Sequence, residues 1–434
     1  MESNSRRVAI TGVGVVSPVG IGSAAFWNGL LEAKSGVDVI RSFDPQGLPS
    51  RMAGEILDFD AKKYVQQRKS LKVMSRQAQL AAAATQLALD DAQLSQAERD
   101  PTRIGVSLGA GMINIELDEI GEAVAASING HQTFDLRKWG HDGMPQLFPL
   151  WMLKHLPNMT ACHLSIFHDA QGPNNTIIQG DASSNLAIGE AYRIVARGGA
   201  DVMLAGGADW KIHPMSILRY CLVGLLSRRN DEPHRACRPY DASRDGTVLG
   251  EGAAVFVLED LQHAKRRGGR IYAEVVGFST SYCGGSAVRL NPQGLGIARA
   301  MRGALADARM NLDDIDFVSG NAAGHVQGDL AESRAIHATF GGDGPRLPVV
   351  SRKGNTSNLS AAGGAIELAA SLLSLEHHVL PPTLNCDHAD PDCGLNVVTG
   401  QPRELDRASR LGAFLSNNVT LGGQSASIVV RQCA

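Results

Sequence analysis

Polar residues in three stretches of the sequence could take part in chemistry. Asp181 stands in IIQGDASSNLAIGEA at the start of a helix-like run, and His325 stands in NAAGHVQGD. Lys353 and Asn358 share the stretch KGNTSNLSAAGG. A carboxylate can attack an activated acyl carbon, but the anhydride that forms is labile and the attack needs a base. An aspartate before a helix also caps it by accepting backbone N–H bonds, and capping is the interpretation that we favour for Asp181.

The cysteines, histidines and serines suggest no metal site and no hydrolase. The side chains in NCDHADPDCG, namely Cys386, His388 and Cys393, are irregularly spaced, so we expect no bound metal. Seven scattered cysteines favour reduced thiols over a disulfide framework. Ser183 and Ser184 lack the Gly-x-Ser-x-Gly setting of hydrolases, and packing in a first helical turn explains them better.

The elements that must hold these residues alternate between strand and helix. Strand-like runs such as RVAITGVGVVS, VMLAGGAD and GAAVFVLED alternate with Ala-rich runs such as SSNLAIGEAYRIVARGG. This is the pattern of layered α/β folds. It starts again after the basic segment HAKRRGG. The sequence therefore predicts an α/β protein with two similar halves, residues 1–260 and 261–434.

The alternation weakens between residues 112 and 160. This stretch holds aromatic residues and turns bounded by proline, which together predict a cap inserted in the N-terminal half. A cap of this kind covers a site or meets a partner, and packing into the core is the other interpretation.

Composition and charge exclude several classes of protein. The 434 residues carry 41 Lys+Arg against 44 Asp+Glu, so no nucleic-acid-binding surface is expected. No apolar run reaches the roughly 18 residues that a spanning helix needs, and the first apolar run predicts a strand, not a signal peptide. We expect a cytoplasmic protein that neither crosses nor binds a membrane.

The stretch RACRPYDASRDGTVLGEGAA at 235–254 resembles the β-ketoacyl synthase family, which carries an Arg-Pro-Phe-Asp…Arg-Asp-Gly…Gly-Glu-Gly-Ala run. The opening RRVAITGVGVVSPVG and the closing SNNVTLGGQSAS are also similar to this family, so the resemblance covers nearly the whole chain. It implies the thiolase fold, a five-layer αβαβα duplication that forms dimers, and it implies no cofactor.

Family chemistry uses a cysteine that accepts the acyl group and two histidines that act on the malonyl thioester and the carbanion left by decarboxylation. The resemblance places Asp181 at the cysteine position, Ala323 at the first histidine position and Asn358 at the second. His325 is a candidate substitute for the first histidine, provided that the shortened loop brings its ring into the same pocket.

Other motif residues are retained or exchanged. In the resemblance, Lys353 and Glu367 match residues of the second-histidine motif, so this chain retains them. In the closing loop, Leu421 replaces the gating phenylalanine, and Gln424 and Ser425 replace Thr-Asn. These three are the expected substrate-binding residues.

Loss of the thiol and of both imidazoles removes every group that condensation requires. The resemblance therefore implies a chain-length-factor-like subunit of a fatty acid or polyketide synthase, which pairs with an active ketosynthase, shapes its acyl pocket and meets acyl carrier protein. Chain length factors carry Gln at the nucleophile position, and Asp181 departs from that pattern.

Two alternatives stay open at this point. One is an acyltransferase or hydrolase of altered chemistry that uses Asp181 with His325, Asn358 and Lys353. The other is a non-catalytic homodimeric scaffold that binds acyl carrier protein.

Overall fold

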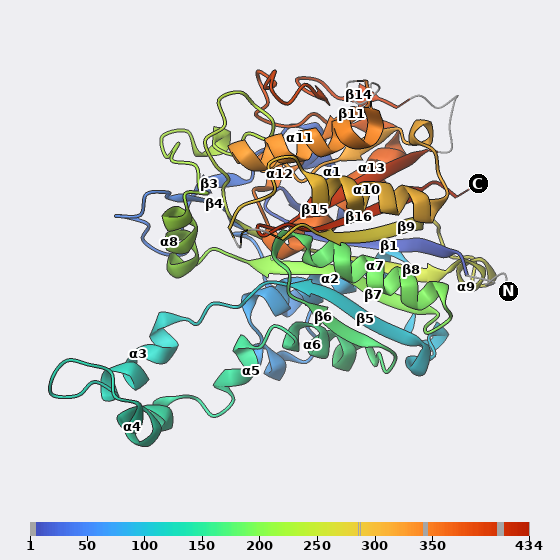
Figure 1. The fold of residues 1–434 in the computed structure, drawn as a ribbon. Coiled ribbons are helices and arrows are strands. Elements are labelled where there is room, and N and C mark those ends of the chain that lie inside the picture. The colour runs from blue at the N-terminus through green and yellow to red at the C-terminus, as the bar shows by residue number, and fades with distance from the viewer. Residues whose placement is uncertain (1–5, 285, 287, 342–345, 406–411, 434) are drawn as a thin grey trace.

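One large twisted sheet runs through the molecule (Figure 1). The computed structural model describes residues 6–433 except 285, 287, 342–345 and 406–411. The strands pair in the order β13-β11-β10-β15-β16-β9-β1-β8-β7-β5-β6, with β2 beside β1. Their bounds are β1 (Val8–Ser17), β2 (Gly20–Ile21), β5 (Ile104–Ala110), β6 (Asn174–Ile177), β7 (Val202–Trp210), β8 (Glu251–Asp260), β9 (Ala273–Tyr282), β10 (Phe317–Ser319), β11 (Pro348–Val350), β13 (Asn396–Val397), β15 (Ala413–Val419) and β16 (Gln424–Arg431).

The two halves of the chain meet at a short pairing between β1 and β9, where Val8–Ile10 lies antiparallel to Ala273–Val275. The strands before residue 261 lie on one side of this junction, and the strands after it lie on the other. Within each half, parallel pairs such as β5 with β7 and β10 with β15 sit beside antiparallel pairs. The β1–β9 pairing joins both halves in one sheet. The division into domains 1–260 and 261–434 stays a prediction.

Helices cover the outer faces of the sheet and fill the space between its halves. Helices α2 (Arg76–Asp91) and α6 (Met159–His168) pack on the N-terminal strands, and α10 (Leu295–Ala308) packs on β9 and β16 with α11 (Val326–Phe340) beside it. Between the halves lie α7 (Ser183–Ala196) and α13 (Gly363–His377), which contact strands and each other. The result is the five-layer αβαβα arrangement of the thiolase fold, as expected.

The central helix α13 shows why a helical layer forms between the two halves of the sheet. Its residues from Gly363 to Leu375 are all buried, and a helix that is apolar or small on all sides is stable only when other elements surround it. Further elements of the body are α1 (Ser23–Leu31), α8 (Pro214–Val223), α9 (Leu261–Arg266), α12 (Lys353–Thr356), several short 3-10 turns, and the small ladders β3 (Val37–Val39) with β4 (Met52–Gly54) and β12 (Val379–Leu380) with β14 (Arg403–Glu404). In the described part of the chain, no helix is long and apolar enough to cross a membrane.

Residues 112–158, which we call the projecting segment, extend away from the body of the molecule (Figure 1). The segment holds α3 (Leu117–Ala126), α4 (Leu136–Lys138) and α5 (Trp151–His155). Large apolar side chains are exposed on it, with Leu136 at 77% and Phe148 at 55% of full exposure. Packing into the core is therefore the wrong interpretation of this stretch.

The starts of α7 and α13 meet beside Gly207 of β7. An added Cβ at Gly207 would lie 2.5 Å from the Ala361 carbonyl oxygen and 2.7 Å from Ser184 Cβ. Ser184 belongs to the first turn of α7, and Ala361 belongs to the turn before α13. The absence of a side chain at Gly207 therefore allows two segments to approach that are far apart in the sequence.

We expect Gly207→Ala to lower the free energy of unfolding by about 1–3 kcal/mol, because the backbone atoms that the methyl group would overlap cannot rotate away. Chemical denaturation measures this difference. The matched control is Gly121→Ala on α3, where an added Cβ has no atom within 4 Å and helix propensity favours alanine. Equal stability of the Gly207 variant and the wild type would contradict the close approach.

Candidate functional site

A cavity of about 710 Å³ lies where the predicted site residues converge. The predicted residues on its wall are Asp181, Ala323, His325, Asn358 and Leu421. Other wall residues come from the end of α8, from positions 245, 247, 288–290 and 321–322, from the end of β15 and from the start of α11. No residue of the projecting segment is among the wall residues, so this segment does not cover the cavity of its own chain.

The chain enters α7 through a tight turn that presents Asp181. Gly180 has φ +52°, in the left-handed region, and an added Cβ there would clash with the Thr420 side chain. The Ser183 hydroxyl accepts a hydrogen bond from the Gln179 N–H at 2.7 Å and donates to the Gly180 carbonyl at 2.7 Å. The Ser183 hydroxyl thus links the two ends of this turn.

The prediction that Asp181 caps the helix is wrong. Helix α7 begins at Ser183, its N-cap residue is Ala182, and no side chain caps it. Asp181 lies one residue earlier, in a 3-10 turn (Gly180–Ala182). The extra turn moves the carboxyl group away from the free N–H groups of α7, and Asp181 faces the cavity instead.

The carboxyl group of Asp181 is under opposing influences. Burial raises its pKa above the ordinary aspartate value, and the nearby charge of Asp209 acts in the same direction. The positive charge of Lys353 and a hydrogen bond from Asn358 act in the opposite direction, and burial prevails. Oδ1 of Asp181 is buried and has no hydrogen-bond partner among the described residues.

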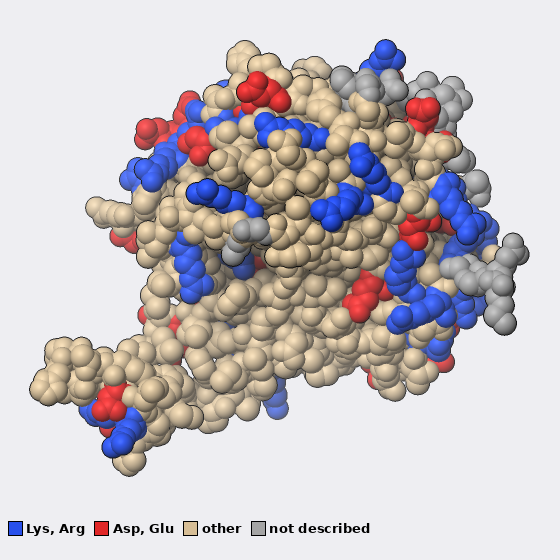
Figure 2. Space-filling view, viewed as in Figure 1, with Lys and Arg blue, Asp and Glu red and all other residues tan. Residues whose placement is uncertain are grey.

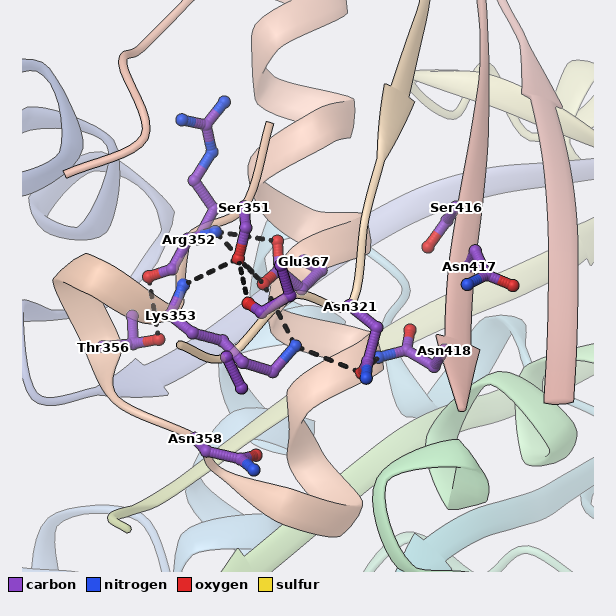
Figure 3. Close-up of polar contacts among 12 residues, drawn as sticks. Asn321, Ser351, Arg352, Lys353, Thr356, Asn358, Glu367, Ser416, Asn417 and Asn418 are labelled. Atoms are coloured by element: carbon purple, nitrogen blue, oxygen red, sulfur yellow. Dashed lines mark hydrogen bonds and ion pairs between the residues drawn. The ribbon is translucent and has the colours of Figure 1, made fainter. Parts of the chain in front are cut away.

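A second turn before α13 positions Asn358. Its backbone N–H donates to the Val248 carbonyl at 2.7 Å, and its Oδ1 accepts from the Ser360 N–H at 2.9 Å. Ser357 and Ser360 have positive φ angles of 69° and 46°, a conformation that persists only where surrounding contacts hold it. Figure 3 shows Asn358 below the polar cluster formed by Lys353 and its neighbours.

Lys353 and Glu367 lie behind the cavity wall and form a buried ion pair (Figure 3). The Lys353 ammonium donates to Glu367 Oε1 at 3.4 Å and to Asn321 Oδ1 at 3.3 Å. Glu367 also accepts from the Arg352 backbone N–H with both oxygens at 3.1 Å. Burial raises the pKa of Glu367, and the charges of Lys353 and Arg352 oppose this. The pair fixes the segment that carries Asn358.

The loop 321–329 lacks an imidazole at the expected place. The N–H groups of Ala323 and Gly324 donate to Asp329 at 3.1 and 3.2 Å, which folds the loop around this carboxylate. Burial raises the pKa of Asp329 to about 6. His325 is the N-cap of α11, and its Nδ1 accepts from the Gly328 N–H at 3.1 Å. His325 thus reaches the cavity wall, but one ring nitrogen is used to cap a helix.

Some predicted residues lie outside the cavity wall. Gln424 lies on β16 and donates to the Thr280 hydroxyl at 2.6 Å, and Ser425 is fully buried beside it. Of the three residues expected from the closing loop, the structure brings only Leu421 to the cavity. The substrate-binding roles of all three stay predictions.

Tyr220 and Cys237 are among the residues near the site that were not found from the sequence. Tyr220 of α8 lines the cavity, and the helix that carries it has no strong pattern in the sequence. Cys237 lies behind Ala323, where its thiol contacts the Ala323 carbonyl at 3.6 Å. Burial raises the pKa of this thiol to about 12, so it stays protonated.

The stretch with Cys386, His388 and Cys393 is a loop in which both cysteines are buried. Within the described ranges, no group of three or more His, Cys, Asp or Glu side chains is arranged to hold a metal ion.

Comparison with known families gives two matches that follow each other along the chain. The model described as beta-ketoacyl synthase, N-terminal domain, matches residues 5–264, and the model described as beta-ketoacyl synthase, C-terminal domain, matches residues 272–387.

Similar proteins span the full chain. A 3-oxoacyl-(acyl-carrier-protein) synthase 2 from Coxiella burnetii is 34% identical over 426 residues, which are 98% of each chain. One from Vibrio harveyi is 34% identical over 432 residues, covering 99% of this chain and 100% of the other.

Solved structures show the same relationship. A beta-ketoacyl synthase from Burkholderia phymatum is 31% identical with a TM-score of 0.87, and a chain of the ishigamide ketosynthase/chain length factor is 29% identical with a TM-score of 0.86. A type II polyketide synthase complex of an acyl carrier protein with its hexaketide-bound ketosynthase contains a chain that is 28% identical with a TM-score of 0.86. Each alignment covers 99% of this chain and 100% of the other.

The environment of Asp181 predicts how stability depends on pH. Because its pKa is higher in the folded than in the unfolded chain, the folded state binds the proton more tightly, and this group's contribution to stability falls as pH rises above the ordinary aspartate value. Asp181→Asn removes the ionisable group, so the variant lacks this loss of stability with rising pH. We expect the variant to be more stable than the wild type by about 1–3 kcal/mol at neutral pH, with the difference shrinking in acid.

Denaturation across a pH series measures this difference. Asp58→Asn, at an exposed position, is the control and should follow the wild-type profile. A wild type that is more stable than the Asp181 variant at neutral pH would show that Lys353 and Asn358 stabilise the carboxylate by more than burial destabilises it, contrary to this account.

Proposed function

Because the chain belongs to the β-ketoacyl synthase family, we propose that it is a chain-length-factor-like subunit of a fatty acid or polyketide synthase. In this role it pairs with an active ketosynthase and contributes to the shape of the pocket that holds the partner's acyl chain. It does not condense acyl groups itself.

The observation that carries the proposal is the set of groups on the cavity wall. Condensation needs a thiolate and two imidazoles, whereas Asp181, Ala323 and Asn358 offer a carboxyl, a methyl and an amide group. No cysteine is among the wall residues, and the buried, protonated thiol of Cys237 cannot replace the nucleophile. These replacements support a protein that keeps the scaffold of a ketosynthase without its reaction.

An altered acyl-transfer reaction has less support. A carboxylate nucleophile needs a base within reach, and the only imidazole among the wall residues is that of His325. Burial and the charge of Arg244 lower the pKa of His325, and its Nδ1 already caps α11. Lys353 is engaged with Glu367 and Asn321, so it does not supply a free amine.

The projecting segment supports pairing with another protein. A concentration of exposed apolar side chains marks an interaction surface in a soluble protein. The exposed ones on this segment include Leu117, Phe134, Leu136, Met144, Phe148, Leu150 and Met152. The edge strand β6 leads into the turn that holds Asp181, and no described strand pairs with its outer side. A partner on this side would therefore sit close to both the segment and the Asp181 turn.

Basic side chains support contact with acyl carrier protein. Figure 2 shows Lys and Arg side chains spread over the face that carries α10 and α11. Arg289 lies on the cavity wall, and Arg219 on α8 is exposed nearby. An acidic carrier protein would be attracted to this face.

Co-expression with an intact ketosynthase from the same organism tests the proposal. We expect a stable heterodimer that makes products of defined length, and we expect Leu136→Asp together with Phe148→Asp to break the complex, because a charge cannot be buried unpaired at an apolar interface. Size-exclusion chromatography and product mass spectrometry are the measurements.

Leu57→Asp, at a position outside the projecting segment with 57% exposure, is the matched control and should leave the complex intact. A homodimer that forms under the same conditions, with no effect on product length, would favour the scaffold alternative and refute the pairing.

A further inference from the structure

Asp181 differs from the other carboxyl groups on the cavity wall in its hydrogen bonding. Asp329 accepts from three backbone N–H groups, those of Tyr240, Ala323 and Gly324, at 3.0–3.2 Å. Asp181 Oδ1, by contrast, is buried without a partner in the described part of the chain.

Glu332 and Asp245 are also satisfied. Glu332 accepts from the Tyr240 hydroxyl, the Asn321 N–H and the Asn417 amide, all at 2.7–2.8 Å. Asp245 accepts from the Ser227 hydroxyl at 2.7 Å and from the Arg228 N–H at 3.2 Å. Asp181 is thus the wall carboxyl that is least well satisfied when ionised, because its buried Oδ1 accepts no hydrogen bond in the described part of the chain.

The groups around Asp181 determine which form of the carboxyl the site favours. Asn358 is oriented by the Ser360 N–H, which donates to its Oδ1 at 2.9 Å and leaves the amide N–H groups free for the carboxyl. Lys353 cannot move to Asp181 without leaving Glu367. An ionised Asp181 would therefore keep one buried oxygen unpaired, which is costly, whereas a protonated one carries an O–H that can donate.

We propose that Asp181 is a positioning residue whose protonated carboxyl group donates a hydrogen bond to the carbonyl oxygen of an acyl ligand in the cavity. The inference goes beyond the proposed function, because it places an acyl group in this chain's own cavity and not only in the pocket of the partner. It adds the role of the residue that stands at the nucleophile position: it holds a carbonyl group without forming a bond to it.

Two further observations agree with this role. The wall carries apolar side chains against which an acyl chain can lie, namely Val223, Leu225, Val288, Leu290, Val326, Val419 and Leu421. Burial and Asp209 raise the pKa of Asp181, which favours the donor form. Besides Asp209, the titratable groups facing it are Lys353 and Tyr220, with His325 and Asp329 also on the cavity wall.

Binding of octanoyl-N-acetylcysteamine, a thioester that needs no carrier protein, tests the inference by calorimetry on the full chain. We expect the affinity of the wild type to fall as pH rises from about 5 to about 9, because a carboxylate cannot donate. Asp181→Asn keeps an N–H donor that does not titrate, so its affinity should lack this fall. Asp181→Ala should bind up to about tenfold more weakly than the wild type in acid.

The three proteins share His325 and Asp329, so any difference between their pH profiles belongs to Asp181. Equal affinities in all three proteins, no binding of the thioester, or a wild-type affinity that rises with pH and is lost in Asp181→Asn would overturn the inference. The last outcome would mean that the ligand donates to the carboxylate.

These measurements use the chain without a ketosynthase. Failure of the pairing experiment would therefore leave the binding result standing, and failure of the binding experiment would leave the pairing result standing. A cooperative unfolding transition in each variant confirms that it is folded.

Discussion

The close approach of two helix starts at the centre of the molecule is the constraint on which the site depends. The first turn of α7 and the turn before α13 come from different halves of the chain, and both pack against Gly207. Gly364 plays a similar part in α13, because an added Cβ would lie 2.5 Å from Asn185 Oδ1 and 2.8 Å from Ser184 Oγ. This contact places Asp181 and Asn358 on one cavity wall, so the arrangement of the site is a property of the fold more than of the groups that occupy it.

This explains how the fold can persist after the catalytic groups have been replaced. The buried Lys353–Glu367 pair holds the segment of Asn358 in place, and removing one member of such a pair is costly whether or not a reaction takes place. Among the side chains that face the cavity, Asp181 and Ala323 take no part in that pair, and Asn358 contributes one hydrogen bond to its turn, from the Ser360 N–H. Asp181, Ala323 and Asn358 can therefore differ from a thiol and two imidazoles while the turns that carry them remain.

The sequence predicts the layers and the place of the site well, because both depend on long local patterns. The alternation of apolar runs marks β1, β7 and β8, and the three polar motifs converge on one cavity. Capping by Asp181 was a wrong prediction, because the 3-10 turn before α7 moves the N-cap position by one residue, to Ala182, and no propensity reveals that shift. Tertiary packing places Tyr220 on the cavity wall and keeps Gln424 and Ser425 of β16 off it. The order of residues in the sequence does not specify this packing.

The central claim is that the turn before α7 still presents a side chain to an acyl group but no longer carries a nucleophile. Intact-protein mass spectrometry after incubation with octanoyl-acyl carrier protein tests it most directly, comparing the wild type with Asp181→Cys. The account predicts no added mass on the wild type and an octanoyl adduct on the cysteine variant, because a thiol restored at this turn regains covalent capture. An octanoyl adduct on the wild type that is lost in Asp181→Ala would contradict it.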